Sequence, residues 1–449
     1  MNLNKAQVRL ILLLDLVLIV LIIAIGVQFA LGGRSLYPAG NEPQANADDV
    51  LPSSAPETEY SAVRQARLSL SDSIDLETNL GGSDDERLVD IVAIGDRVYV
   101  FGNTASGDFD AVGGTGAFVG VLDTDLNTIA FFRPSDRKIA GVTLAEGGFL
   151  LALCGDNGVS LALMDTCGEI KTAAPETDGE FSALRLTDDG YVLITSVTHS
   201  PLAKKKLLLR TFDFSLNPTC ERMISSPYSL EFVDVFKAGE TFTVFFNAVS
   251  DLSRHAGAAQ CGLTADEPKI TYIDKGGAYR AAAVAPVPDG WAMAVIYEGG
   301  DGAVMLLSSD FNKKTVVFQG ASSPDSAILN YCDGVYYVGF FGGNASVSLA
   351  CDPSFSSRKS LSAIGDFSRA TDYIAGNGWG LFAGECGDGL GVVGSRGSCF
   401  LRFGSKNERN PLLACSGDLF FVAAESRGVS RDVGGSFGGT DIWVARLKI

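Results

Sequence analysis

Short apolar stretches separated by tight turns recur along residues 90–449 of the chain. Each unit has a strand of small apolar residues, a turn that contains Gly, Asp or Asn, and a second strand of bulkier apolar residues. In the first unit, Asp90–Ile94 leads through the turn Gly95–Asp96 into Val98–Phe101. Turns of this composition match the twist of paired antiparallel strands. The pattern therefore predicts a series of β-hairpins.

The hairpin is found eight times, at intervals of roughly 40–52 residues. The later turns lie at residues 147–148, 188–190, 239–240, 288–290, 333–334, 376–378 and 416–418. A third strand that often ends near an Asp, such as Ala117–Asp123, follows the hairpin, and a fourth strand usually comes next. We therefore expect an all-β fold, a β-propeller of about eight four-stranded blades, with seven blades as the alternative.

The two ends of this repeat array are incomplete in complementary ways. The last unit stops after its third strand, Ile442–Leu447, and lacks an outer strand. The segment Ser69–Leu80 has strand character but precedes the first complete blade. Placing this segment as the outer strand of the last blade would pair both ends of the ring and remove an exposed edge. The sequence therefore predicts a closed ring.

Two of the repeat units also carry a family resemblance. Residues 438–447 read GGTDIWVARL, and residues 113–122 read GGTGAFVGVL. Both resemble the bacterial β-propeller repeat of secreted and surface proteins, in which a Gly-rich turn, an Asp and an aromatic residue precede a short apolar strand. Gly116 stands where that repeat has Asp. The resemblance is clear in these two blades and follows the others in outline, and it implies a surface-exposed propeller but no particular chemistry.

A long apolar run, Leu10–Leu31, lies near the N-terminus. At about 1.5 Å per residue it would span roughly 33 Å as a helix, enough to cross a membrane. Lys5 and Arg9 precede it and acidic residues dominate after it, which places the N-terminus in the cytoplasm. A cleaved signal peptide is the alternative, although its apolar core is normally only about 7–15 residues long.

These observations predict an order of segments along the chain. Residues 1–9 are expected in the cytoplasm, residues 10–32 as a single transmembrane helix that contacts the membrane, and residues 33–61 as a flexible linker. Residues 62–449 are expected to form the propeller on the outer side of the cell membrane.

Composition narrows the class of partner. The net charge is −18, so the surface repels nucleic acid and anionic lipid headgroups, and we expect no nucleic-acid partner. The 52 Gly against 15 Pro fit many short strands and tight turns.

Nine cysteines are present, and the spacing of Cys154 from Cys167 would put them at opposite ends of a hairpin, too far apart for a disulfide.

The face that carries the loops between second and third strands is the expected binding face. Its longest loops are Gly102–Gly116 in the first blade and Glu425–Thr440 in the last, which become neighbours if the ring closes. The candidate binding residues in and next to these loops are Asp108, Asp110, Asp432 and Asp441. Their carboxylates suit Ca²⁺, but no calcium-binding repeat is present, and such Asp residues commonly cap main-chain amides instead. We therefore predict no metal or other cofactor.

A second candidate on that face is a basic spot. It comprises Lys204, Lys205 and Lys206, with His255 from the next blade, and it would suit an anionic partner. A catalytic role for His255 would need a specified serine, and no Gly-x-Ser-x-Gly motif accompanies it. We therefore assign no catalytic residue.

The function expected from sequence is a membrane-anchored, extracytoplasmic scaffold that binds a protein or a glycan at a bacterial cell surface. A carbohydrate-active enzyme is one alternative. Such enzymes use carboxylates in pairs, and the predicted inner strands offer only a few, Asp90, Asp234 and Asp372. A sensor or subunit of an envelope complex is the other. Whether the protein is an enzyme stays open, with a binding protein favoured.

Overall fold

The computed structural model describes residues 63–66, 74–109, 114–156, 158–200, 203–250, 253–263, 267–273, 279–312, 314–322, 324–332, 334–342, 347–352, 358–360, 367–376, 379–386, 389–394, 400–403, 408–427 and 439–447. All regular elements among these residues are β-strands. This part of the chain contains no helix of the length and apolarity that a membrane crossing requires. The predicted helix 10–32 and linker 33–61 lie outside the described residues.

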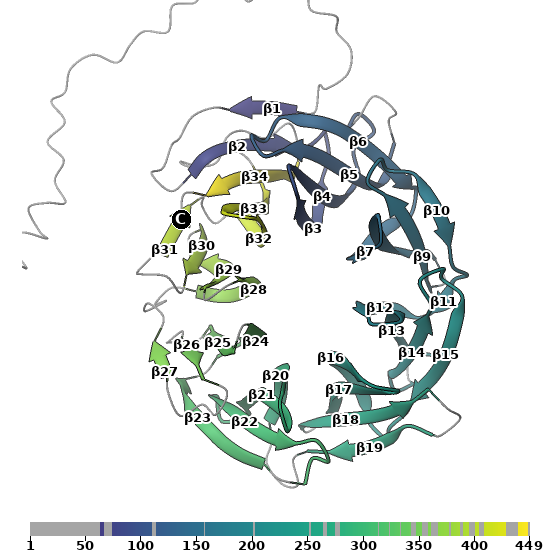
Figure 1. Cartoon of the computed structure of the whole chain (residues 1–449), viewed down its shortest axis with the longest axis vertical. Helices are drawn as coiled ribbons and strands as arrows, with labels where there is room; N and C mark the ends of the chain where they lie inside the picture. The colour runs from purple at the N-terminus through teal and green to yellow at the C-terminus, as the bar shows by residue number, and fades with distance from the viewer. Residues whose placement is uncertain are drawn as a thin grey trace, which may run out of the picture. The chain divides into compact units, whose positions relative to one another are not determined.

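The strands of the unit Thr58–Ile449 form sheets arranged in a ring around a central axis (Figure 1). The strands nearest the axis, called inner strands, are β3 (Glu86–Ile94), β7 (Lys138–Ala145), β12 (Glu180–Thr187), β16 (Ser229–Ala238), β20 (Tyr279–Val287), β24 (Ser326–Cys332), β28 (Phe367–Gly376) and β32 (Glu408–Ser416). The second strands are β4 (Arg97–Thr104), β8 (Gly148–Cys154), β13 (Gly190–Val197), β17 (Thr241–Val249), β21 (Gly290–Tyr297), β25 (Val335–Phe341), β29 (Trp379–Cys386) and β33 (Leu419–Ser426).

Third and outer strands complete each sheet. The third strands are β5 (Gly116–Asp123), β9 (Gly158–Asp165), β14 (Lys206–Phe212), β18 (Arg254–Gly262), β22 (Asp301–Ser308), β26 (Val347–Cys351), β30 (Gly389–Gly394) and β34 (Asp441–Leu447). The outer strands are β6 (Thr128–Ser135), β10 (Ile170–Ala173), β15 (Pro218–Ile224), β19 (Lys269–Tyr272), β23 (Lys314–Ser322), β27 (Arg358–Ser360), β31 (Phe400–Phe403) and β2 (Ile74–Leu80). Two short strands, β1 (Val63–Ala66) and β11 (Thr177–Asp178), add to β2 and β9.

Neighbouring strands within a set pair antiparallel, in the order inner, second, third, outer. We call each such set a blade and name it by its inner strand. The sets β16–β19 and β20–β23 are recorded as one sheet, but a single bridge between His255 and Tyr279 joins them. A ring of twisted four-stranded sheets around an axis is a β-propeller. The all-β propeller predicted from the hairpin repeat is therefore confirmed.

Most inner strands carry a β-bulge at the same height. In β3 the register shifts between Leu88 and Asp90, and in β16 it shifts between Phe232 and Asp234. Similar shifts occur in β7, β12, β20, β28 and β32. A bulge bends its strand and re-aims the side chains next to it. Here the bend recurs beside the axis, four residues before the end of β3 and of β16.

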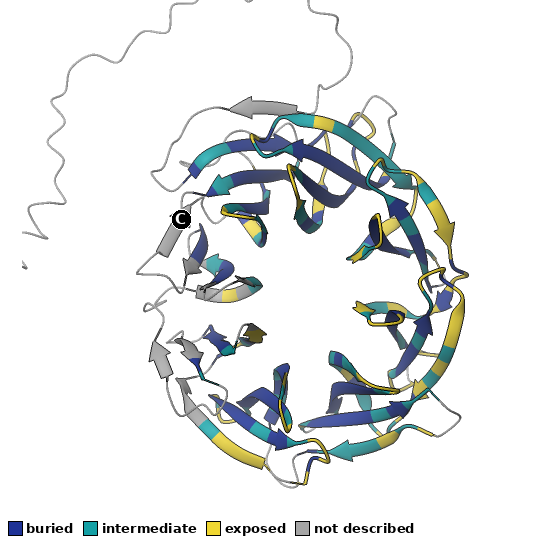
Figure 2. Ribbon diagram, viewed as in Figure 1, coloured by how far each residue is buried: buried dark blue, intermediate teal, exposed yellow. Residues whose placement is uncertain are grey.

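The core is divided among the blade-to-blade contacts. One cluster joins Tyr99 and Phe101 of blade β3 to Phe149 and Met164 of blade β7, with Tyr99 and Phe149 ring centroids 4.7 Å apart. Similar clusters lie between other neighbouring blades. Figure 2 shows the same division, since burial concentrates in the second and third strands while the tips of the inner hairpins are exposed. The apolar surface of a blade is therefore buried by its neighbours rather than by itself.

The ring closes through β2, which pairs antiparallel with β34 from Ile74↔Leu447 to Leu80↔Ile442. The predicted closing segment thus supplies the outer strand of blade β32, and β1 adds a further strand outside it. The fully buried Trp443 donates its indole N–H to Glu77 Oε2 at 2.8 Å across this pair. Residues from both ends of the propeller therefore share one core.

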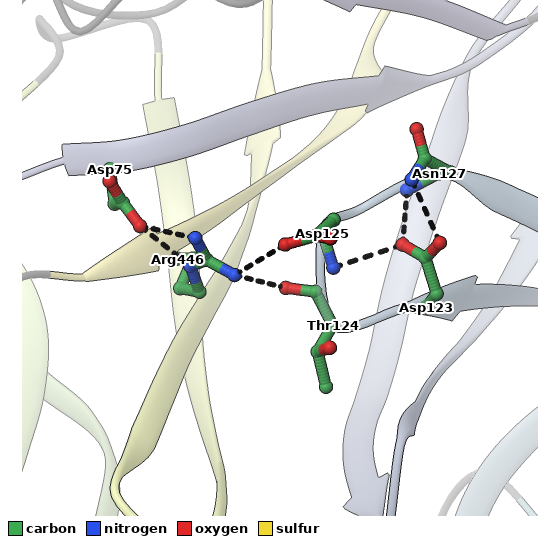
Figure 3. A network of polar contacts seen from close by, with 6 residues as sticks. All are labelled: Asp75, Asp123, Thr124, Asp125, Asn127 and Arg446. Carbon is green, nitrogen blue, oxygen red and sulfur yellow. Dashed lines mark hydrogen bonds and ion pairs between the residues drawn. The ribbon is translucent and has the colours of Figure 1, made fainter.

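Arg446 ties the closing strand to the first blade as well (Figure 3). Its guanidinium forms an ion pair with Asp75 of β2, and Nη1 donates to the Thr124 carbonyl at 2.8 Å and to Asp125 Oδ1 at 2.9 Å. The turn that receives it is shaped by Asp123, whose Oδ1 accepts the main-chain N–H groups of residues 125 and 127. One side chain therefore joins β34, β2 and the turn between β5 and β6.

We predict that blocking the β2–β34 pairing weakens the whole propeller. Thr78→Pro would remove a main-chain donor from the middle of this sheet, a position where proline is not tolerated. Thermal unfolding should show a clearly lower Tm, and light scattering should show more association through the exposed edge. Gln65→Pro in the edge strand β1 is the matched control and should stay near wild type, because an edge strand tolerates proline. Equal melting of the two variants would contradict closure by β2.

Candidate functional site

A hollow of about 1060 Å³ opens on the face that carries the second-to-third-strand loops of blades β3, β7 and β12. This size is at the upper end of the usual range for ligand pockets. We call it the three-blade hollow. Its lining residues are Asp85, Arg87, Leu88, Val89, Asn103, Thr104, Ala105, Lys138, Ile139, Ala140, Cys154, Gly155, Asp156, Gly158, Asp178, Gly179, Glu180, Phe181, Ser196, Val197, Thr198, His199 and Asn410.

Two of the three inner strands that border the hollow carry a basic residue at their start, whereas β12 begins with Glu180, which pairs with Lys205. Arg87 and Lys138 lie at the start of the inner strands β3 and β7, and both are exposed. Neither forms an ion pair with another described residue, so both charges face solvent in the hollow. His199, also exposed, lies in the loop after β13 on the same face. The hollow therefore presents cations on a protein whose net charge is −18.

The wall farther from the axis is acidic. Asp156 lies in the turn between β8 and β9, and Asp178 belongs to β11, which pairs with β9 opposite Gly158. The main chain at Asp178 is fixed, because Thr195 Oγ1 donates to its carbonyl at 2.7 Å. The neighbouring Thr177 is buried and accepts a hydrogen bond from Arg210 at 2.9 Å. The Asp178 carboxylate is thus exposed on a rigid support.

Side chains at the ends of second strands hold neighbouring blades together, beside this hollow and elsewhere in the ring. Asn103 donates Nδ2–H to the Ile139 carbonyl at 2.8 Å and accepts the Ile139 N–H at 2.7 Å. Its side-chain amide thus makes the two hydrogen bonds that the main chain of a neighbouring strand would make. Asn247 makes the same pair of bonds to Ala281 of blade β20. Glu425 accepts the N–H of Leu88 at 3.2 Å in the same way. We call these contacts inter-blade clasps, and those at Asn103 and Glu425 fix the inner strands β7 and β3 that border the hollow.

Cys154 occupies the corresponding position in blade β7 and also lines the hollow. Burial raises the pKa of its thiol, and a hydrogen bond from the main chain of Phe181 only partly offsets this effect. The thiol is therefore protonated near neutral pH, which does not suit a nucleophile.

The loop Gly102–Gly116 is less open than the sequence suggested. Phe109 in this loop is buried against Phe118, with ring centroids 4.4 Å apart. Ser106 is also buried, and its hydroxyl donates to Glu86 Oε1. This part of the loop is a piece of the core rather than a free recognition loop, and cutting it to a short turn would remove core contacts.

Two of the four candidate Asp residues can be placed, and both contact the connection between β2 and β3. Asp108 is exposed, and its Oδ1 accepts the N–H and the hydroxyl of Ser83, each at 2.9 Å. These bonds hold the pKa of Asp108 below its usual range. Asp441 is fully buried, and a Cβ at Gly81 would lie 2.0 Å from its Oδ1. Asp441 therefore belongs to the framework of the ring and does not reach the surface.

The other two, Asp110 and Asp432, lie outside the described residues. Among the described residues, no group of three or more His, Cys, Asp or Glu side chains is placed to hold a metal ion.

The basic spot lies beside the three-blade hollow. Lys204 Nζ lies 5.9 Å from the centre of the Tyr228 ring, and the His255 ring lies 6.3 Å from the same ring, so Tyr228 brings the two together. Lys205 forms a 3.2 Å ion pair with Glu180, which lines the hollow. Lys206 begins β14 and is partly exposed. His255 Nε2 is 2.7 Å from the hydroxyl of Ser253, a contact that the sequence did not indicate.

The inner-strand carboxylates Asp90, Asp234 and Asp372 all follow a bulge and are partly buried. Each accepts the N–H of the next residue, and Asp372 also accepts the Leu413 N–H at 2.7 Å. Burial raises the pKa of all three, that of Asp90 to about 7 with a smaller contribution from the charge of Asp372. Arg185 lies 3.4 Å from Asp234 and limits the rise there. These bonds tie the carboxylates to the main chain.

Solved structures provide the comparison with known proteins. Sqt1 from Chaetomium thermophilum aligns with a TM-score of 0.51 at 13% identity, over 83% of this chain and 99% of Sqt1. The Dos1 propeller aligns with a TM-score of 0.48 at 13% identity, over 82% of this chain and 94% of the Dos1 chain. The β-propeller domain of the trilobed protease from Pyrococcus furiosus aligns with a TM-score of 0.45 at 9% identity, over 71% of this chain and 97% of that domain. The chain is a β-propeller.

The likeness to these structures concerns the fold alone. No protein-family model matches the sequence, and no curated protein matches it. The secreted or surface type of propeller, suggested by residues 438–447, remains a prediction.

We predict that Asp90 makes the propeller less stable as the pH rises. Its pKa in the folded protein, about 7, exceeds the ordinary value near 3.8, so the stability it contributes is present at low pH and is lost as the pH rises through about 7. Asp90→Asn keeps an acceptor for the Ile91 N–H and should raise Tm at pH 8, with a much smaller gain at pH 5. Asp96→Asn, in the exposed turn after β3, is the control and should change Tm at neither pH. An equal gain from Asp90→Asn at both pH values would contradict the prediction.

Proposed function

We propose that this chain is a binding propeller of eight blades that captures a protein or glycan partner through the three-blade hollow. The observation that carries the proposal is the hollow itself, because it combines exposed charged groups with rigid walls held by inter-blade clasps. Ready-made concave sites with a few fixed polar groups are typical of ligand recognition. The count of eight blades rests on the eight described inner strands. Blades β16 and β20 are counted separately because only a single bridge joins them.

We further propose that residues 10–32 anchor the propeller in the cell membrane and that the propeller lies outside the cytoplasm. The support is the apolar run Leu10–Leu31 with basic residues before it and acidic residues after it. The basic spot at Lys204–Lys206 and His255 would extend the binding surface, since Lys205 already contacts the hollow through Glu180.

The orientation predicts the outcome of a protease experiment. Protease added outside intact cells or spheroplasts should cut the linker 33–61 and release a domain of nearly full size. A cytoplasmic marker protein should stay intact in the same sample. Protection of the propeller until the membrane is broken would contradict the orientation.

Binding through the hollow predicts that reversing its basic side chains reduces partner recovery. The variant Arg87→Glu with Lys138→Glu should recover partners from the producing cells at least about fivefold less well than wild type, because like charges now face the partner's anions. Arg97→Glu with Lys269→Glu changes the net charge equally at other exposed or partly exposed sites and serves as the control. Recovery is measured by quantitative mass spectrometry after matched Tm values are established. Equal recovery by all three proteins would contradict a role for the hollow.

A further inference from the structure

Four lining charges of the three-blade hollow form no ion pair with another described residue, and they divide by sign between different elements. Arg87 and Lys138 come from the inner strands β3 and β7 near the axis (Figure 1), whereas Asp156 comes from the turn between the two middle strands β8 and β9, and Asp178 from β11, which pairs with β9. The other lining carboxylates are already engaged, since Asp85 accepts the Thr440 N–H at 2.8 Å and Glu180 pairs with Lys205. The hollow therefore offers two basic side chains on inner strands and two acidic side chains farther from the axis, none of them in an ion pair within the described part of the chain.

Aromatic side chains are scarce in this hollow. Phe181 is the single aromatic residue that lines it within the described part of the chain. Trp443 is fully buried in the ring closure, and Trp291 is buried against Phe236 and Phe245. Neither tryptophan can present a ring face to a ligand in the hollow. A sugar chain would lack the flat apolar platform that aromatic rings supply.

Small residues line another part of the hollow. Gly155 and Gly179 have no side chains, and Thr198 adds a hydroxyl, whereas the Gly155 N–H donates to the Gly158 carbonyl at 2.8 Å and the Ser196 hydroxyl lies 2.9 Å from that of Ser182. Glycine lets the main chain of a ligand approach closely. A polypeptide has such a main chain and can also carry charges of both signs.

Resting on the proposed binding function, we propose that the hollow binds an extended peptide segment with acidic and basic side chains a few residues apart. Its acidic side chains face Arg87 and Lys138, and its basic side chains face Asp156 and Asp178. The complementary arrangement fixes the direction of the peptide as well as its composition, because the reverse direction places like charges together.

The test uses defined probes and fluorescence anisotropy. The probe is a fluorescein-labelled Gly/Ser peptide with a pair of Glu near one end and a pair of Lys near the other. Matched peptides carry only Glu or only Lys at those positions, and a labelled chitin oligosaccharide represents the glycans. The mixed peptide should bind wild-type protein at least about tenfold more tightly than either single-sign peptide, and higher salt should weaken that binding.

Two charge-reversed variants test the basic pair and the acidic pair separately. Arg87→Glu with Lys138→Glu should weaken binding of the mixed peptide at least about tenfold and strengthen binding of the Lys peptide. Asp156→Lys with Asp178→Lys should weaken the mixed peptide equally and strengthen the Glu peptide. Arg97→Glu with Lys269→Glu should bind the mixed peptide as wild type does.

Three outcomes would overturn the peptide proposal. They are equal affinity for mixed and single-sign peptides, tighter binding of the oligosaccharide, and no binding of any peptide. If partner recovery from cells still depends on Arg87 and Lys138 in those cases, the binding function stands and only the ligand class is wrong. If recovery is also insensitive to these residues, the proposed function fails as well.

Discussion

The pairing of β2 with β34 is the constraint on which the rest of the ring depends. Each blade buries its apolar surface against its neighbours, so an open ring would leave two blade faces in water. The closing pair prevents this and adds the buried hydrogen bond between Trp443 and Glu77. Arg446 extends the closure into the turn after β5. Strand pairing, core packing and an ion pair thus all stabilise the contact between β2 and β34.

The position of the three-blade hollow follows from this construction. Closure places the start of β3 beside the start of β34, where Glu86 N–H donates to the Thr440 carbonyl at 2.6 Å. The clasps at Asn103 and Glu425 then fix the inner strands on which Arg87 and Lys138 lie. A site assembled in this way needs little rearrangement to bind, which lowers the entropic cost of capture.

The sequence predicted the repeating features well, because hairpin turns and strand periodicity are local properties. It also predicted the closing segment, since the leftover strands at the two ends complement each other. It did not predict the burial of Phe109 or Asp441, the clasp at Asn103, or the walls of the hollow. These depend on contacts between blades, such as the bond from Asn103 to Ile139 across 36 residues. Asn103 and Asn247 stand at equivalent ends of second strands, but only the hydrogen bonds show what that repeat does. The motif Asp-x-x-Leu-Asn at 123–127 and 213–217 was a visible signal for the turns after third strands, and its meaning became clear only from the hydrogen bonds.

The pairing of β2 with β34 also matters during synthesis of the protein, because the two strands are made far apart in time. Glu77 and Trp443 meet across 366 positions, so β2 leaves the ribosome long before its partner exists. At about 5–20 residues per second, that wait is on the order of tens of seconds. Throughout it, the edge of β2 that faces away from β1 is unpaired and fits the last blade of any other nascent copy equally well. Two chains made side by side can therefore exchange this strand and form a domain-swapped pair, so crowded translation is the condition under which this ring is most exposed to misassembly.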